Sequence, residues 1–139
     1  SSIYYLLKKL EGEGLIEGHL EEAERGPARK VYRAIPAGEE TLRAGVLDAL
    51  SVPRRCYSPL QLGLCHLPGI PPGEAVAALR QYREALAARL AHVQERQKSQ
   101  QPLPHFIQAM FEHSITMIEA EIGWIEGFIE EMEEEHGQG

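Results

Sequence analysis

The sequence predicts a mainly α-helical protein with one small β-hairpin, and three observations lead to this fold class. Apolar residues recur at helical spacing in several stretches of the 139-residue chain. Near the start, two short stretches with β-branched and aromatic residues flank a Gly-Pro turn, which is typical of a hairpin. Along the C-terminal part, apolar residues repeat every three or four positions, as in a coiled coil. We therefore expect one unit over residues 1–50 and an all-helical region over 51–139.

A short helix is expected over residues 1–12. Its apolar residues recur at the spacing of one helix face, namely Ile3, Leu6, Leu7 and Leu10. Gly12 and Gly14 follow and end the helix, since glycine readily takes the left-handed conformation found at helix ends. The remaining surface of the helix is polar, basic and aromatic, and carries Ser1, Ser2, Tyr4, Tyr5, Lys8 and Lys9.

A hairpin over residues 15–35 and a linking helix over 37–50 are expected next. The hairpin tip and the returning strand carry basic side chains, Arg25, Arg29 and Lys30 among them. Helix, strand, basic turn and strand follow one another in a winged helix, where the helix enters the DNA major groove and the hairpin lies along the phosphates. The order of elements therefore favours a DNA-binding unit.

Four motifs in this region are similar to those of PadR-family transcriptional regulators. They are SIYYLLKKLE at 2–11, GLI at 14–16, GPARKVY at 26–32 and PAG at 36–38. Two positions depart from the family pattern: Tyr5 stands where proline is frequent, and Ile35 where threonine is common. The resemblance implies a winged helix-turn-helix whose N-terminal helices are absent from this sequence, followed by an all-α, coiled-coil-like dimerisation region.

The last helix, expected to begin near Pro104, carries the clearest periodicity in the chain. One apolar row steps alternately by four and three residues, and we predict that it forms the dimer interface: Phe111, Ile115, Ile118, Ile122, Ile125, Ile129 and Met132. A second row, formed by Met110, Met117 and Trp124 with Phe128 beside it, widens the apolar stripe. The alternative is that the seam belongs to the core of a helical bundle within one chain.

The resemblance extends to this helix through Glu121-Ile122-Gly123-Trp124, a segment like one that PadR proteins often carry near their C-terminus. It implies a homodimer through the C-terminal helices and, as in relatives that respond to phenolic acids or flat hydrophobic drugs, a small aromatic effector. Met117, Trp124 and Phe128 are the candidate effector-binding residues. The alternative for these three side chains is ordinary core packing.

Charge is distributed unevenly along the chain. The net charge is −7, yet nine glutamates and no Lys or Arg follow Lys98, so the preceding part sums to +2. The expected DNA-binding unit is therefore not acidic overall, which is compatible with binding to phosphate. Composition is ordinary for a soluble protein, with 43% hydrophobic residues. No run reaches the length of a membrane span, so we expect a cytoplasmic protein with no membrane contact.

Chemistry beyond binding has little support in the sequence. We expect no cofactor and no metal: Cys65 and His66 are adjacent, but no second pair with ligand spacing follows. Cys56 and Cys65 are expected to be free thiols. There is no glycine-rich phosphate loop and no nucleophile elbow, so the protein is not expected to be an enzyme.

The predicted function is that of a dimeric repressor, which binds a near-palindromic double-stranded DNA operator and is released by a small aromatic effector. The alternative is a helical interaction module that uses its acidic C-terminal helix to bind a protein partner without specific DNA binding. The two hypotheses differ in whether the protein prefers a particular DNA sequence.

Overall fold

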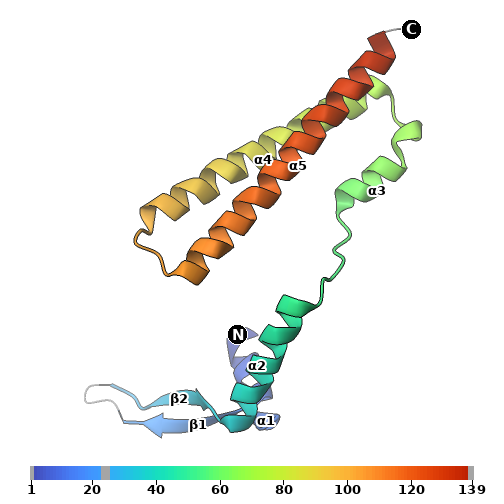
Figure 1. Cartoon of the computed structure of the whole chain (residues 1–139). Coiled ribbons are helices and arrows are strands. Elements are labelled where there is room, and N and C mark those ends of the chain that lie inside the picture. The colour runs from blue at the N-terminus through green and yellow to red at the C-terminus, as the bar shows by residue number, and fades with distance from the viewer. Residues whose placement is uncertain (1, 23–25, 138–139) are drawn as a thin grey trace. The chain divides into compact units, whose positions relative to one another are not determined.

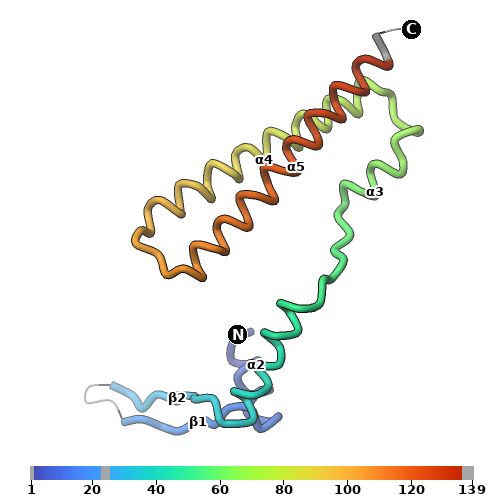
Figure 2. The backbone as a smooth tube through the Cα atoms, in the orientation of Figure 1, coloured from blue at the N-terminus to red at the C-terminus, as the bar shows by residue number. Residues whose placement is uncertain are grey.

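A computed structural model describes residues 2–22 and 26–137 of the chain. It divides into two compact units, Ser1–Cys56 and Tyr57–Gly139. The ribbon in Figure 1 and the backbone trace in Figure 2 follow the chain from a helix and hairpin in the first unit to two long helices in the second. The mainly α fold with one hairpin, predicted from the sequence, is confirmed.

The first unit contains helix α1 (Ser2–Gly12), strands β1 (Ile16–Glu21) and β2 (Arg29–Ala34), and helix α2 (Pro36–Ser51). The strands form a two-stranded antiparallel sheet whose register pairs Ile16 with Ala34 at one end and Glu21 with Arg29 at the other. The chain therefore runs helix, hairpin, helix, and the hairpin starts from the end of α1.

Two glycines explain the tight connections of this unit. Gly14 has a φ of +70°, a conformation that glycine adopts without steric cost, and it lies in the turn between α1 and β1. Gly38 lies in the first turn of α2 against the backbone of Leu15. A Cβ on Gly38 would lie 2.8 Å from the Leu15 carbonyl carbon and closer still to the oxygen. The same carbonyl oxygen accepts the Ile35 N–H at 3.2 Å, so α2 starts directly against the base of the hairpin.

The second unit is entirely helical among its described residues. It contains α3 (Pro59–Cys65), the 3₁₀ turn η1 (Leu67–Gly69), α4 (Pro72–Ser99) and α5 (His105–Gly137). Ser58 caps α3, because its hydroxyl accepts the Gln61 N–H at 3.4 Å. Pro59 and Pro72 stand in the first turns of their helices, where the missing N–H leaves no hydrogen bond unmade. Helices α4 and α5 pack side by side as a long hairpin (Figures 1 and 2).

The core of the second unit lies between α4 and α5. Its buried residues are Leu79, Leu86, Ile118, Ile125 and Ile129, and Ile125 is fully buried. Ile122 and Met132 pack against this core while partly exposed. In the structure, five residues of the predicted coiled-coil seam belong to the core that α5 forms with α4 of the same chain: Ile118, Ile122, Ile125, Ile129 and Met132. This is the single-chain packing that was the alternative for the seam, and contact of the seam with a second chain stays a prediction.

None of the helices in the described ranges is both long enough and apolar enough to span a membrane.

Candidate nucleic-acid interface

The predicted DNA-contacting face of α1 is accessible. Tyr4 and Tyr5 are 75% and 68% exposed, and Ser2, Lys8 and Lys9 are also on the surface. Lys9 is 3.9 Å from the carboxylate of Glu13, one helical turn further on. For Lys8, the described part of the chain offers no carboxylate partner. Two aromatic rings and one unpaired ammonium group therefore project from the same short helix.

The predicted apolar face of α1 is only partly covered in this unit. Ile3 and Leu6 are 67% and 53% exposed, whereas Leu7 and Leu10 are half-buried. The C-terminal half of the helix is held by the turn that follows, where Leu15 N–H donates to the Leu10 carbonyl at 3.0 Å. The covered half of the face is thus the half next to the hairpin.

The described lysine and arginine side chains of the hairpin are all paired with carboxylates. Arg29 donates to Glu21 at 2.9 Å, and Arg33 is 2.5 Å from Glu17. Both pairs join residues directly opposite in the strand register. Exposed ion pairs of this kind are weak, so either arginine can exchange its carboxylate for a DNA phosphate at little cost.

Lys30 differs from the two arginines because its partner belongs to α1. Its ammonium group lies 2.7 Å from Glu11 Oε2 and 3.0 Å from Oε1. It also lies 4.8 Å from the centre of the Tyr32 ring. The hydrogen bond with Glu11 raises the pKa of Lys30 above its ordinary value, and the same contact lowers the pKa of Glu11. Both groups therefore stay charged at neutral pH.

Two of the predicted DNA contacts, Ser1 and Arg25, lie outside the described residues.

The candidate effector-binding residues lie on α5 in the second unit. Met117 and Trp124 are 57% and 49% exposed, and Met110, one heptad earlier, is 65% exposed. Trp124 stacks on Phe128 with a centroid distance of 5.2 Å and an interplanar angle of 16°. Trp124 also lines a cavity of about 230 Å³ together with Ser58, Leu60, Gln61, Leu64 and Glu121. Met117 is therefore not a core residue, whereas Phe128 is partly buried against the helical core.

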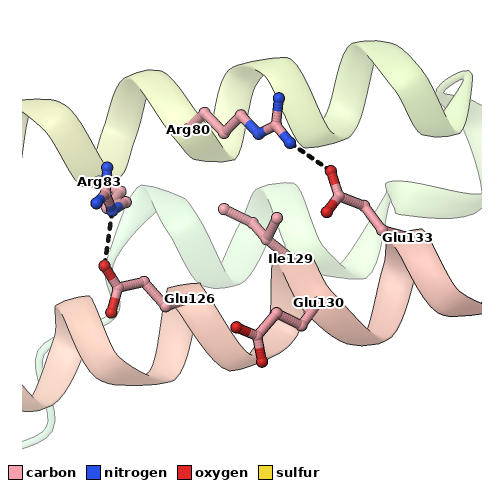
Figure 3. A pocket seen from close by; sticks show the side chains of 6 residues that line it. All are labelled: Arg80, Arg83, Glu126, Ile129, Glu130 and Glu133. Atoms are coloured by element: carbon pink, nitrogen blue, oxygen red, sulfur yellow. Dashed lines mark hydrogen bonds and ion pairs between the residues drawn. The ribbon is translucent and has the colours of Figure 1, made fainter.

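Two further concave regions of the same unit involve α4. A groove of about 450 Å³ crosses α4 and α5, and Figure 3 shows its ion pairs, Arg80 with Glu133 and Arg83 with Glu126. These arginines are thus neutralised by α5. An apolar cavity of about 400 Å³ lies between the α3–η1 segment and the start of α4, with Glu74 at its edge.

Both cysteines are exposed free thiols. Across residues 2–22 and 26–137, no three His, Cys, Asp or Glu side chains are grouped so that they could hold a metal ion.

Sequence reasoning missed two polar contacts. Glu11 was recognised only as part of a motif, although it joins α1 to both strands. A carboxylate in the last turn of a helix is unfavourable next to the helix dipole, and this was the available signal that Glu11 has a partner elsewhere. The second contact joins Tyr82 Oη to Glu121 at 2.9 Å, across α4 and α5.

A short helix followed by an antiparallel hairpin and a second helix is the C-terminal half of a winged helix, here joined in sequence to an α-helical hairpin. The chain is thus a winged-helix protein with a helical second unit. Residues 1–44 match the family model described as "Transcriptional regulator PadR-like family". This part of the first unit is therefore similar to PadR-like transcriptional regulators, the family that its motifs resemble.

Solved structures of similar fold extend this likeness to the second unit. Bacillus subtilis PadR in complex with operator DNA superposes with a TM-score of 0.77 at 18% identity, over 94% of this chain and 78% of that chain. The protein smu.1604c from Streptococcus mutans UA159 gives 0.64 at 16% identity, over 93% and 77%. The PadR-like regulator BC1756 from Bacillus cereus gives 0.62 at 16% identity, over 94% and 74%.

At these identities the likeness is one of fold. No curated protein matches the chain.

Proposed function

We propose that the protein is a dimeric DNA-binding repressor that reads a near-palindromic operator through α1 and its hairpin. The observation that carries this proposal is the exposed face of α1, where Tyr4, Tyr5 and Lys8 project beside a hairpin that bears arginines. The fold likeness to a PadR protein whose structure was solved on operator DNA supports it. The rings of Tyr4 and Tyr5 meet base edges and sugars in the major groove, while Ser2, Lys8, Lys9 and Arg29 contact phosphates.

Lys8 offers the sharpest test of this face. Each phosphate contact that is lost reduces the dependence of log K on log salt by about 0.9. We expect Lys8→Ala to weaken binding to all DNA and to reduce the slope by about 1.8, because the dimer loses one contact in each protomer. Lys98→Ala is the matched control, because Lys98 lies in the last turn of α4 in the other unit. An unchanged slope for Lys8→Ala would refute the assignment.

The proposed dimer forms through the exposed row on α5. This row, in which Met110, Met117 and Trp124 repeat at seven-residue intervals, is accessible to a second chain. In contrast, Ile118, Ile125 and Ile129 of the heptad seam are buried in the core that α5 forms with α4. To read the two halves of a near-palindromic operator, the two α1 helices of the dimer need a separation of about 34 Å, the spacing of successive major grooves on one side of DNA. Sedimentation of Met117→Glu tests this surface: the substitution introduces a charge and should give monomers. A dimer of unchanged affinity would place the interface elsewhere.

A flat aromatic effector would bind against the stacked Trp124 and Phe128 pair and bias the dimer toward one separation of the DNA-binding units. The supporting feature is the half-exposed indole beside the cavity that it lines. Quenching of Trp124 fluorescence by phenolic acids, accompanied by release of DNA, is the expected result. Quenching without any change in DNA affinity would show binding that has no regulatory effect.

A further inference from the structure

Glu11 contacts both strands of the hairpin from the last turn of α1. Its Oε1 atom accepts the backbone N–H of Gly18 on β1 at 3.2 Å and the ammonium group of Lys30 on β2 at 3.0 Å. Its Oε2 atom accepts a second hydrogen bond from Lys30 at 2.7 Å. One carboxylate therefore joins three elements. We call Glu11, Gly18 and Lys30 the helix–wing clamp.

The surroundings are shaped for this contact. A Cβ on Gly18 would lie 2.9 Å from Glu11 Oε1 and 2.9 Å from Tyr32 Cε1, and it would collide with the Lys30 side chain. A glycine inside a strand often marks such a close approach. The Lys30 ammonium group also lies over the Tyr32 ring, which limits the positions it can occupy.

Among the described residues, the ion pair of the clamp, between Glu11 and Lys30, links α1 to the hairpin at a point beyond their connecting turn. The turn itself fixes the base of the hairpin, where Leu15 is hydrogen-bonded to Leu10. Lys30 lies opposite Leu20 in the register, toward the other end of the strands. The pairs of Arg29 with Glu21 and of Arg33 with Glu17 stay within the hairpin and do not constrain its angle to α1.

We propose that Glu11 is a positioning residue, which sets the angle between the recognition helix and the wing through Gly18 and Lys30, and that Lys30 serves this clamp instead of anchoring a phosphate. The inference rests on the proposed function, because an angle between helix and wing affects sequence reading only if both touch DNA. Operator binding requires both elements at once, whereas weak contact with any duplex does not.

Electrostatics and positioning make opposite predictions for Glu11→Ala. Removal of a carboxylate near DNA strengthens binding if only charge matters. If Glu11 positions the wing, the substitution weakens binding to the operator by roughly 2- to 100-fold, which is the range of coupling between side chains in one network. Binding to a scrambled duplex does not become weaker. Glu13→Ala is the matched control, since Glu13 follows α1 directly and, among the described residues, forms its ion pair with Lys9 and not with the hairpin.

The experiment measures anisotropy of a duplex selected from a random pool by the wild-type protein, and of its scrambled version, across a series of salt concentrations. Glu11→Ala and Lys30→Ala should each lower the ratio of operator to scrambled affinity, and the double variant should lose little more than either single variant. Lys30→Ala should keep the wild-type salt slope. The proposal is overturned if Glu11→Ala binds the operator as well as Glu13→Ala does. It is also overturned if Lys30→Ala reduces the slope by about 1.8, as the loss of one phosphate anchor in each protomer of the dimer would.

Amide hydrogen exchange separates this proposal from the proposed function. The Gly18 amide should exchange faster in Glu11→Ala than in the wild type or in Glu13→Ala, whether or not DNA is present. If the wild type showed no preference for the selected duplex, the proposed function would fail while this result still established the clamp. Unchanged exchange at Gly18 would overturn the clamp itself.

Discussion

Truncation of Ile125 should destabilise the second unit strongly, because this side chain is fully buried between α4 and α5. Ile125→Ala removes methyl and methylene groups worth about 0.8 kcal/mol each, or about 2.4 kcal/mol in total. The cavity that remains adds to this cost, so we expect a loss of about 2–5 kcal/mol. Ile125→Val removes a single group and should cost about 0.5–1.5 kcal/mol.

Urea denaturation followed by far-ultraviolet circular dichroism measures these losses. Met117→Ala, on the same helix but 57% exposed, is the control and should change the free energy of unfolding by less than about 0.5 kcal/mol in the monomer. Because the partner of Ile125 is in the same chain, its substitution should leave the dimer dissociation constant unchanged under native conditions. A loss below 0.5 kcal/mol for Ile125→Ala, or selective weakening of the dimer, would refute the packing described here.

Further substitutions test two individual contacts. Gly38→Ala should destabilise the first unit by about 1–3 kcal/mol in thermal denaturation, because the added methyl group would overlap the Leu15 carbonyl. Gly123→Ala, which has open space around it, should instead stabilise α5 by about 0.5–1 kcal/mol. Equal effects of the two substitutions would contradict the close approach of Gly38 to Leu15. Tyr82→Phe should cost about 1 kcal/mol at neutral pH by removing the hydrogen bond to Glu121. That hydrogen bond and partial burial raise the pKa of Tyr82. The contribution of the hydrogen bond to stability is therefore complete below about pH 10 and is lost as the pH rises through the folded-state pKa. A stability difference between wild type and Tyr82→Phe that grew above about pH 10 would contradict this direction of the pKa shift.

The order of elements could be predicted from local features of the sequence. Gly14 and the turn residues around Gly26 and Pro27 locate the hairpin, since glycine and proline restrict where strands can run. The long C-terminal helix follows from its apolar period. These signals act over a few residues, which is why they can be read without knowledge of the tertiary structure.

The partner of the heptad seam could not be predicted in the same way. Apolar residues at alternating spacings of three and four face a neighbouring helix, and the pattern is the same whether that helix belongs to the same chain or another. The buried stripe of α4, with Leu79 and Leu86, supplies the neighbour in the structure. What distinguishes the second row is exposure, which the sequence period does not encode.

The role of individual charges was also beyond sequence reasoning. Lys30 is one of several basic residues near the hairpin, and only the fold brings it to Glu11, nineteen positions earlier. Lys8 has the same charge and was assigned the same role, yet it has no carboxylate partner among the described residues. The presence or absence of a carboxylate partner in the fold therefore distinguishes these two lysines, which the sequence alone does not.

We propose that this protein recognises a particular DNA sequence. The most direct test is fluorescence anisotropy of the protein with the DNA upstream of its own gene and with a scrambled control of equal length, at two salt concentrations. We expect tighter binding to the upstream fragment at both salt concentrations, since base contacts from α1 add to the phosphate contacts. Equal and weak binding to both duplexes would contradict it and would favour the helical interaction module.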